Sequence, residues 1–309
     1  GYGVLEFANY VCFFPHLIAG PIIRHHELIP QFGGLAARVP AERLAQGLAL
    51  FVLGLAKKVW VADQLAPIAD AGFALAAPGA VAAWQAALAY TLQLYFDFSG
   101  YSDMAIGLAA MFGLELPVNF AAPYRAQSIR EFWRRWHMTL SRFLRDYLYI
   151  PLGGNRHGLV RSYAATMLTM LLCGLWHGAG WTFVAWGGLH GLAVCGNRAW
   201  SALGRQLPRP LGWLLTMLFV IAGWVLFRVE SFASAWVLLE GMAGVAGAGQ
   251  AAGEGWMAIA GAALLALVGP TNLALVQRRW LTHPALALPF ALALVVTVLR
   301  VGQGRGLDF

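Results

Sequence analysis

Three histidines lie in apolar stretches of the sequence, where an ionisable side chain is costly and therefore suggests a functional role. His177 ends a long apolar run, His190 lies in a second one, and His137 follows a run of aromatic and basic residues. Histidine is the side chain best suited to accept and return a proton near neutral pH. We therefore expect proton-transfer chemistry, with His177 as the strongest candidate because Gly178 and Gly180 let another group approach it closely.

Each of these positions also has a purely structural interpretation. A buried histidine can serve only to hydrogen-bond a backbone carbonyl, and His137 can be an amphipathic side chain at a membrane interface. Cys173 stands four residues before His177 and would share its helix face. With this spacing, a mechanism through a cysteine–histidine acyl-enzyme stays an alternative, although cysteine packs readily as a small hydrophobe.

Two carboxylates and a glycine-rich turn add polar groups to the apolar background. Asp97 and Asp103 could relay protons, bind a cation or pair with arginines, and we expect the arginine pairing. They stand six residues apart, about 240° around a helix, and so do not share a face. Asn155 lies in a turn between Pro151 and Gly158 whose freed amides could cradle an anion. The turn lacks the Gly-Lys-Ser/Thr ending of a nucleotide loop, so the spacing favours a simple tight turn.

The composition indicates a membrane protein. The 309 residues are 60% hydrophobic and 11% charged, whereas soluble domains carry roughly 25% charged residues. Alternating strand-like patterns are absent, so we expect membrane-spanning helices, which satisfy their own backbone hydrogen bonds. The net charge of +7 comes largely from arginines between residues 125 and 161. Their clustering favours a cytoplasmic loop near anionic lipid heads over nucleic-acid binding.

The apolar segments predict how these groups are carried. Segments 161–177 and 181–194 are each shorter than the roughly 20 residues that cross a bilayer, so they are half-helices or one helix broken at glycines. Broken helices at membrane depth tend to line cavities. Segments 81–96 and 104–116 are expected to be separated by the polar stretch between them, and residues 63–80 to be a connection.

Local signals mark two further helices. Ser128 followed by Glu131 is typical of a capping box that begins a helix. Phe132 and Trp136 then recur at helical spacing, which predicts an amphipathic helix at the interface. Lys57 and Lys58 near the end of another apolar run are expected to extend toward the membrane surface.

The sequence resembles the membrane-bound O-acyltransferases (MBOAT), and most closely their bacterial alginate O-acetyltransferase branch. The resemblance runs from near residue 1 to about residue 230 and rests on five segments in the same order: 13–22, 95–103, 132–137, 151–156 and 174–178. It implies an all-α, polytopic membrane protein with broken or re-entrant helices around a central tunnel. It also implies one membrane domain over residues 1–309, N-terminally truncated, with residues 117–160 as a basic amphipathic insert.

The resemblance implies roles for individual residues. The histidine of the family's Trp-His-Gly motif, here His177, is the catalytic one, and His137 in Arg-Trp-His lines the same tunnel. The remaining tunnel candidates are Trp176, Trp136, Asp97, Asp103, Arg134, Asn155 and His190. We expect His177 to act as general base on an acceptor hydroxyl and His137 to orient the acceptor or donate to the developing oxyanion. No metal site is expected.

The implied reaction moves an acetyl group from a cytoplasmic thioester, acetyl-coenzyme A or an acylated carrier, to hydroxyls of an exported polysaccharide such as alginate. No tightly bound cofactor is expected. The expected partners are an esterase-like SGNH acetyltransferase in the periplasm, the polysaccharide and membrane lipids, and no nucleic acid is expected. The expected location is the bacterial inner membrane.

Three alternative functions stay open. They are D-alanyl or lipid O-acyl transfer, a proton-coupled transporter that uses Asp97, Asp103 and His177 as a relay, and a secretion subunit without chemistry.

Overall fold

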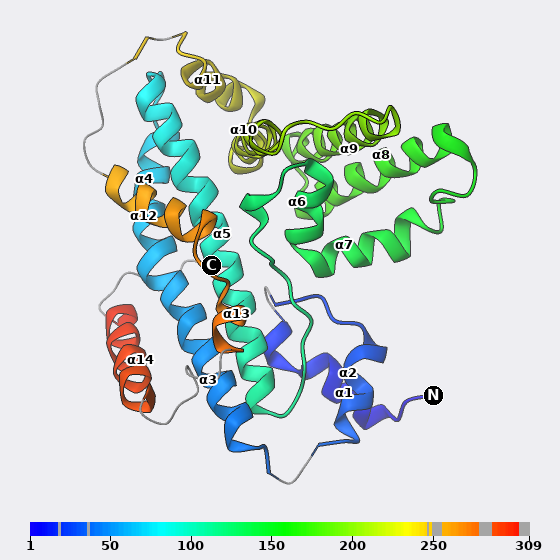
Figure 1. The fold of residues 1–309 in the computed structure, drawn as a ribbon, viewed down its shortest axis with the longest axis vertical. Coiled ribbons are helices and arrows are strands. Elements are labelled where there is room, and N and C mark those ends of the chain that lie inside the picture. Colours follow the sequence, from blue (N-terminus) through cyan, green and yellow to red (C-terminus); the bar gives the residue numbers. More distant parts are fainter. Residues whose placement is uncertain (18–19, 36–37, 246, 249–254, 278–285, 303–309) are drawn as a thin grey trace. The chain divides into compact units, whose positions relative to one another are not determined.

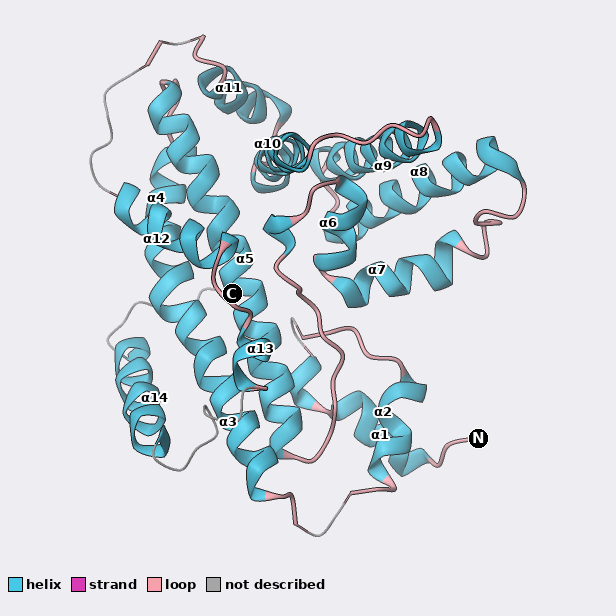
Figure 2. Ribbon diagram, in the orientation of Figure 1, coloured by secondary structure: helices cyan, strands magenta, loops and turns pink. Residues whose placement is uncertain are grey.

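The computed structural model describes residues 1–17, 20–35, 38–245, 247–248, 255–277 and 286–302, and this part of the chain contains helices and loops but no strand (Figure 2). The helices in chain order (Figure 1) are α1 (Val4–Cys12), α2 (His25–Phe32), α3 (Ala41–Ala56), α4 (Asp63–Phe73), α5 (Ala80–Met111), α6 (Ile129–Arg135), α7 (Met138–Leu144), α8 (Gly158–His177), α9 (Trp181–Ala202), α10 (Arg209–Arg228), α11 (Phe232–Met242), α12 (Trp256–Leu267), α13 (Asn272–Val276) and α14 (Ala287–Gly302). The predicted all-α class is confirmed.

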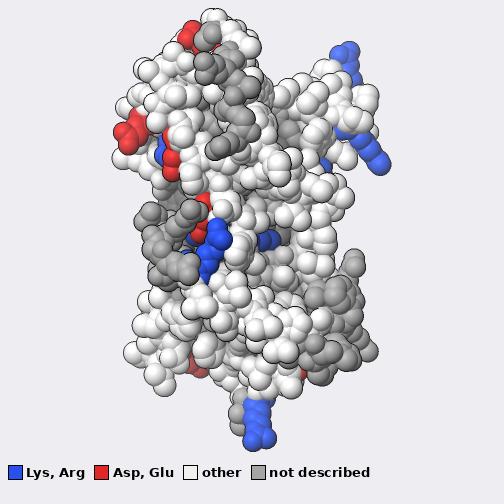
Figure 3. Space-filling model, turned by 90° about the vertical axis from the view of Figure 1, so that its left-hand side faces the viewer, with Lys and Arg blue, Asp and Glu red and all other residues white. Residues whose placement is uncertain are grey.

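Three helical stretches within the described residues are long and apolar enough to cross a membrane: residues 41–73, α8 and α10. The first of these joins α3 to α4 through a π-helical turn, Lys57–Ala62. On the face shown in Figure 3, charged residues are few and scattered among uncharged ones. These features fit a protein whose outer surface meets lipid.

The chain forms two compact units, each built from separate stretches. The first unit contains Gly1–Gln64, Gln93–Ala121 and Val268–Phe309, and the second contains Leu65–Leu92 and Ala122–Leu267. The single membrane domain over residues 1–309 stays a prediction. Most of the 117–160 insert belongs to the second unit.

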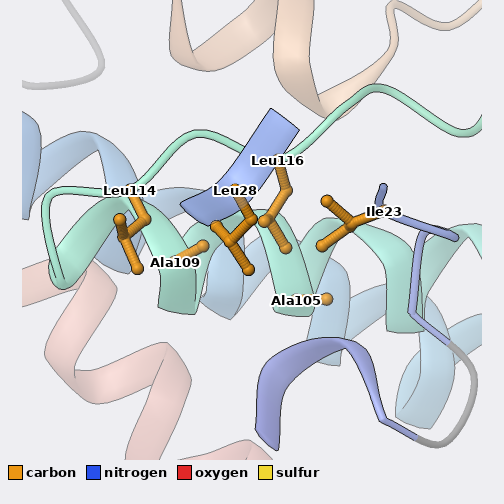
Figure 4. Packing of buried hydrophobic residues seen from close by; sticks show 6 residues of the cluster. All are labelled: Ile23, Leu28, Ala105, Ala109, Leu114 and Leu116. Carbon is orange, nitrogen blue, oxygen red and sulfur yellow. The ribbon is translucent and has the colours of Figure 1, made fainter. Parts of the chain in front are cut away.

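Glycines bring α3 and α5 together in the first unit. A Cβ atom added at Gly54 would lie 2.6 Å from the carbonyl oxygen of Gly100, and one at Gly47 would lie 2.6 Å from that of Gly107. The two glycines on each helix are seven residues apart, so they lie on one face. Small residues of this kind let helix backbones approach closely in a membrane. Beside them, α2 and α5 enclose a small apolar cluster (Figure 4) that consists of Ile23, Leu28, Ala105, Ala109, Leu114 and Leu116.

A helical hairpin of α8 and α9 forms the frame of the second unit. A Cβ atom added at Gly174 would collide with the carbonyl oxygen of Phe183, and one at Gly187 would collide with that of Met170. The two backbones are therefore in direct contact near the turn, Gly178–Gly180. Helices α6 and α10 pack against α9. This packing holds the end of α8 in a fixed position relative to the side chains of α9.

Three expectations about the segments were wrong. Helix α5 runs without interruption through the polar stretch 97–103, because polar side chains there have partners on the π-helical turn 57–62. Residues 63–73 are helical and continue α3 instead of forming a connection. The segments around the glycine turn are two separate helices of 20 and 22 residues, since α8 begins earlier and α9 ends later than their apolar cores.

Candidate active site

His177 is the last residue of α8 and lies half-buried at the edge of an aromatic cluster. Its ring centroid is 4.9 Å from that of Trp176, 5.4 Å from that of Trp186 and 5.0 Å from that of Phe227. The side chain of Trp176 is itself 61% exposed. His177 is therefore packed against aromatic rings but remains partly exposed.

His137 lies at the junction between α6 and α7, where the backbone turns sharply. It has φ +41° and ψ +54°, the left-handed conformation, and it precedes the first residue of α7. A non-glycine residue in this region stores backbone strain of order 1 kcal/mol, and such residues gather at functional sites. The turn directs His137 inward, so that only 4% of it is exposed.

The helix that precedes His137 begins as the sequence predicts. The backbone N–H of Glu131 donates to Ser128 Oγ over 3.2 Å, which confirms Ser128 as the N-cap of α6. The Glu131 carboxylate accepts from the backbone N–H of Gln127, one residue before the cap, over 2.8 Å. Both hydrogen bonds fix where α6 starts and hence where His137 falls.

Burial, and to a lesser extent charge repulsion from the nearby His177, lower the pKa of His137 from its ordinary 6.5 to about 3. The two imidazoles therefore lie close enough to sense each other's charge. They come from the α6–α7 junction and from the end of α8 in the second unit. His137 is neutral at physiological pH, the form that can both accept and donate a hydrogen bond.

His190 lies deeper in the same cluster and is 1% exposed. Its Nδ1 accepts a hydrogen bond from Trp133 Nε1 over 3.1 Å. Its ring centroid lies 4.7 Å from that of Trp186 and 5.0 Å from that of Phe219. All three predicted histidines thus belong to the second unit, and Trp186 contacts two of them.

A cavity of about 650 Å³ opens beside this cluster in the second unit. Trp133 belongs both to its wall and to the aromatic contacts around His190. The remaining wall is largely apolar, with Leu144, Met170 and Val194 among its residues. It also carries basic and polar groups: Arg130, Arg145, Arg198, Ser141, Tyr149, Asn155 and Ser201. Its chemistry suits a ligand with an anionic group and a hydrogen-bonding chain.

Asn155 belongs to a hydrogen-bonded group on this wall. Tyr149 donates to Asn155 Oδ1 over 2.7 Å, and the hydroxyl of Ser162 lies 2.8 Å from that of Tyr149. Arg198 donates to the same Ser162 hydroxyl. Sequence reasoning did not select Arg130 or Arg198, although Arg198 is a charged residue on a largely apolar helix, which is a usable signal.

Asp97 and Asp103 are in the first unit and form ion pairs with lysines. Lys57 Nζ lies 2.7 Å from Asp103 Oδ2, which also accepts from Asn272 over 2.9 Å. Lys58 Nζ lies 2.9 Å from Asp97 Oδ1 and 2.8 Å from a carboxylate oxygen of Asp63. The expected pairing with arginines was wrong, as was the expectation that both lysines extend to the surface. The π-helical turn directs both lysines toward α5 instead.

Three other residues from the sequence analysis are either buried in packing contacts or exposed on the surface. Trp136 is 4% exposed, with its ring centroid 4.9 Å from that of Trp224. Arg134 is exposed. Cys173 is fully buried, so a thioester could not reach its thiol without a local rearrangement. Among the described residues, no group of three or more histidine, cysteine, aspartate and glutamate side chains could hold a metal ion.

The helices, the buried histidines and the motif order define one class of protein. The chain belongs to the membrane-bound O-acyltransferase family, whose model matches residues 1–239.

Curated relatives show which branch is most similar. The chain is 49% identical over 249 residues to the "Peptidoglycan O-acetyltransferase" of Helicobacter pylori, an alignment that covers 79% of this chain and 47% of that protein. It is 50% identical over 242 residues to the "Probable alginate O-acetylase AlgI" of Pseudomonas aeruginosa, covering 78% and 46%. The "Teichoic acid D-alanyltransferase" of Streptococcus thermophilus is 29% identical over 63% of this chain and 50% of that protein. The chain thus spans about half the length of these relatives.

Proposed function

We propose that this protein is a bacterial inner-membrane O-acetyltransferase that moves an acetyl group from a thioester to hydroxyls of an exported polysaccharide. The observation that carries the proposal is that a half-buried histidine, His177, lies within electrostatic range of a buried neutral one, His137, in a chain about half identical to O-acetyltransferases. The lower identity to the D-alanyltransferase favours acetyl over D-alanyl transfer.

His177 acts as the general base in this mechanism. It takes the proton from an acceptor hydroxyl while the hydroxyl oxygen forms a bond to the thioester carbonyl carbon. The carbon–sulfur bond then breaks, the thiolate leaves, and the proton on His177 passes to the sulfur. A positioned base of this kind contributes about 10²–10⁴-fold to the rate. His137 orients the acceptor hydroxyl.

The cavity beside Trp133 accommodates the donor. Its arginines match the phosphates of coenzyme A or of a carrier-bound phosphopantetheine, because guanidinium groups bind phosphate oxygens strongly. Trp133 lies between this cavity and Trp186, which contacts His177. The ring contacts from Trp133 to Trp186 and from Trp186 to His177 thus link the cavity wall to the base.

A periplasmic esterase-like SGNH acetyltransferase is the proposed partner that completes delivery to the polymer. The polymer belongs to the class that the named relatives modify, alginate or peptidoglycan.

The experiment measures base-labile acetate on the exported polysaccharide in cells that produce the full-length protein or its variants. His177→Ala and His177→Gln are expected to abolish acetylation at unchanged protein levels. His26→Ala, which changes an exposed histidine of the first unit, is the matched control and should acetylate normally. Mass analysis of the glycan separates acetyl from D-alanyl groups. Undiminished acetylation by the His177 variants would falsify the proposal.

A further inference from the structure

Two buried N–H groups on α9 have no hydrogen-bond partner within the described residues. They are Trp186 Nε1 and His190 Nε2, from side chains that are each 1% exposed. A buried polar group without a partner costs about 1–3 kcal/mol, so such groups in a folded protein need an explanation.

The protonation of His190 follows from its other nitrogen. Nδ1 accepts the hydrogen bond from Trp133 Nε1, so it carries no proton. In a neutral imidazole the proton is then on Nε2, which makes Nε2 a donor. An indole Nε1 can only donate. Both unpartnered groups are therefore donors, and the atom that satisfies them must be an acceptor.

Gly223 of α10 lies against these two nitrogens. A Cβ atom added at Gly223 would lie 3.2 Å from His190 Nε2 and 3.6 Å from Trp186 Nε1. Both nitrogens thus border the same bare face of one glycine. A side chain at this position would press on both nitrogens.

We propose that His190 Nε2–H and Trp186 Nε1–H bind the carbonyl oxygen of the acetyl group during transfer. This inference rests on the proposed function. The ring centroid of Trp186 lies 5.4 Å from that of His177, so the indole that would hold the oxygen contacts the proposed base.

The assignment fits the electron flow of the reaction. When the hydroxyl oxygen bonds to the carbonyl carbon, the carbonyl π electrons move to oxygen and give it a negative charge. That charge returns to reform the double bond as the carbon–sulfur bond breaks and the thiolate leaves. Fixed N–H donors in a buried site stabilise this oxygen most while it is charged. His190 and Trp186 are then catalytic residues, although neither takes up a proton.

Gly223→Ala is the sharpest test, because it places a methyl group against both nitrogens and leaves both side chains intact. Removal of one such donor typically slows acyl transfer about 10²-fold, and we expect at least this loss in the turnover of the full-length protein. Gly196→Ala is the matched control, since it changes a glycine of α9 whose added Cβ meets nothing within 4 Å.

Trp186→Phe tests the indole N–H separately, because the variant keeps an aromatic ring. It should lower kcat with little change in the KM for acetyl-coenzyme A. Trp213→Phe is the control for losing an indole N–H, which here donates to the backbone oxygen of Tyr124 over 2.8 Å. This control should lower the midpoint of thermal unfolding and leave kcat unchanged.

Wild-type kcat in both Gly223→Ala and Trp186→Phe would overturn the inference. A lower thermal midpoint with unchanged kcat per folded molecule would also overturn it, because the donors would then hold only a structural water. Retained acetylation in His177→Ala, by contrast, rejects the proposed function itself, so the two failures are distinguishable.

Discussion

Trp133 Nε1 donates a hydrogen bond to His190 Nδ1 over 3.1 Å, and the same indole forms part of the cavity wall. One side chain thus contacts the proposed donor cavity and sets which nitrogen of His190 carries the proton. Trp133→Phe removes the hydrogen bond and keeps the ring. We expect kcat to fall about tenfold, which corresponds to about 1.4 kcal/mol, with the fold retained. Steady-state kinetics on purified protein test this, and an unchanged kcat would contradict the role of Trp133.

The glycine contacts in the α8–α9 hairpin hold His177 next to Trp186. Gly187→Ala places a methyl group against the carbonyl oxygen of Met170, and overpacking of this kind costs about 1–3 kcal/mol. We expect a lower midpoint of thermal unfolding and a loss of acetylation. Gly261→Ala, where the added methyl group meets nothing within 4 Å, should leave both unchanged. Equal thermal midpoints for Gly187→Ala and Gly261→Ala would contradict this, because they would show that α8 and α9 can move apart without loss of stability.

Two substitutions at His137, where the backbone is left-handed, distinguish the effect of backbone strain on stability from the effect of the imidazole on acetylation. Both His137→Gly and His137→Ala remove the imidazole, but only glycine adopts φ +41° readily. The glycine variant should therefore be more stable than the alanine variant by about 1 kcal/mol, while both lose most acetylation. Denaturation of the two purified variants measures the difference. A more stable alanine variant would mean that the turn relaxes on substitution.

Acid should destabilise the protein partly through His137. The folded protein holds its pKa at about 3, whereas the unfolded chain takes up a proton below the ordinary 6.5. Between these two values the unfolded state binds more protons, so the free energy of unfolding rises with pH there and levels off above, as far as this group is concerned. The thermal midpoint should fall between pH 7 and pH 4. His137→Asn, which tolerates the left-handed backbone, should show a shallower decline; a slope equal to that of the wild type would rule out this contribution.

Arginines of the cavity are expected to bind the donor. Arg198→Ala should raise the KM for acetyl-coenzyme A about tenfold, as expected for the loss of one charge-assisted hydrogen bond of about 1.5–3 kcal/mol. The fold should persist, because Arg198 pairs with the Ser162 hydroxyl and not with a carboxylate. Arg205→Ala, which changes an exposed arginine stacked on Trp200, is the control. If a phosphopantetheine-loaded carrier protein is used in place of acetyl-coenzyme A and only its KM responds, the carrier is the natural donor.

Sequence reasoning located the histidines because an ionisable residue in an apolar run is conspicuous by itself. It also located the start of α6, since the cap at Ser128 needs only neighbouring residues. It could not foresee that α5 continues through Asp97 and Asp103, because polar residues indicate a loop unless their partners are known. Those partners, Lys57 and Lys58, are some forty residues earlier in the chain.

The cavity residues were harder to predict for a similar reason. Arg130 and Arg198 line the same cavity only because α6 packs on α9. No local sequence pattern links two residues so far apart in the chain. The bare face of Gly223 likewise has meaning only beside Trp186 and His190. Local signals thus identify single groups, and packing decides which of them act together.

The exposed indoles beside the glycine turn bear on how deep in the membrane the proposed reaction takes place. Trp176 and Trp181 are 61% and 76% exposed, and tryptophan gathers where lipid headgroups meet water. They flank the end of a span-length helix, so we expect His177 to lie near the headgroups and not at the centre of the bilayer. In the proposed reaction, a long hydrophilic polymer would then present its hydroxyl at the rim of the membrane, and only the small acetyl unit would have to enter it.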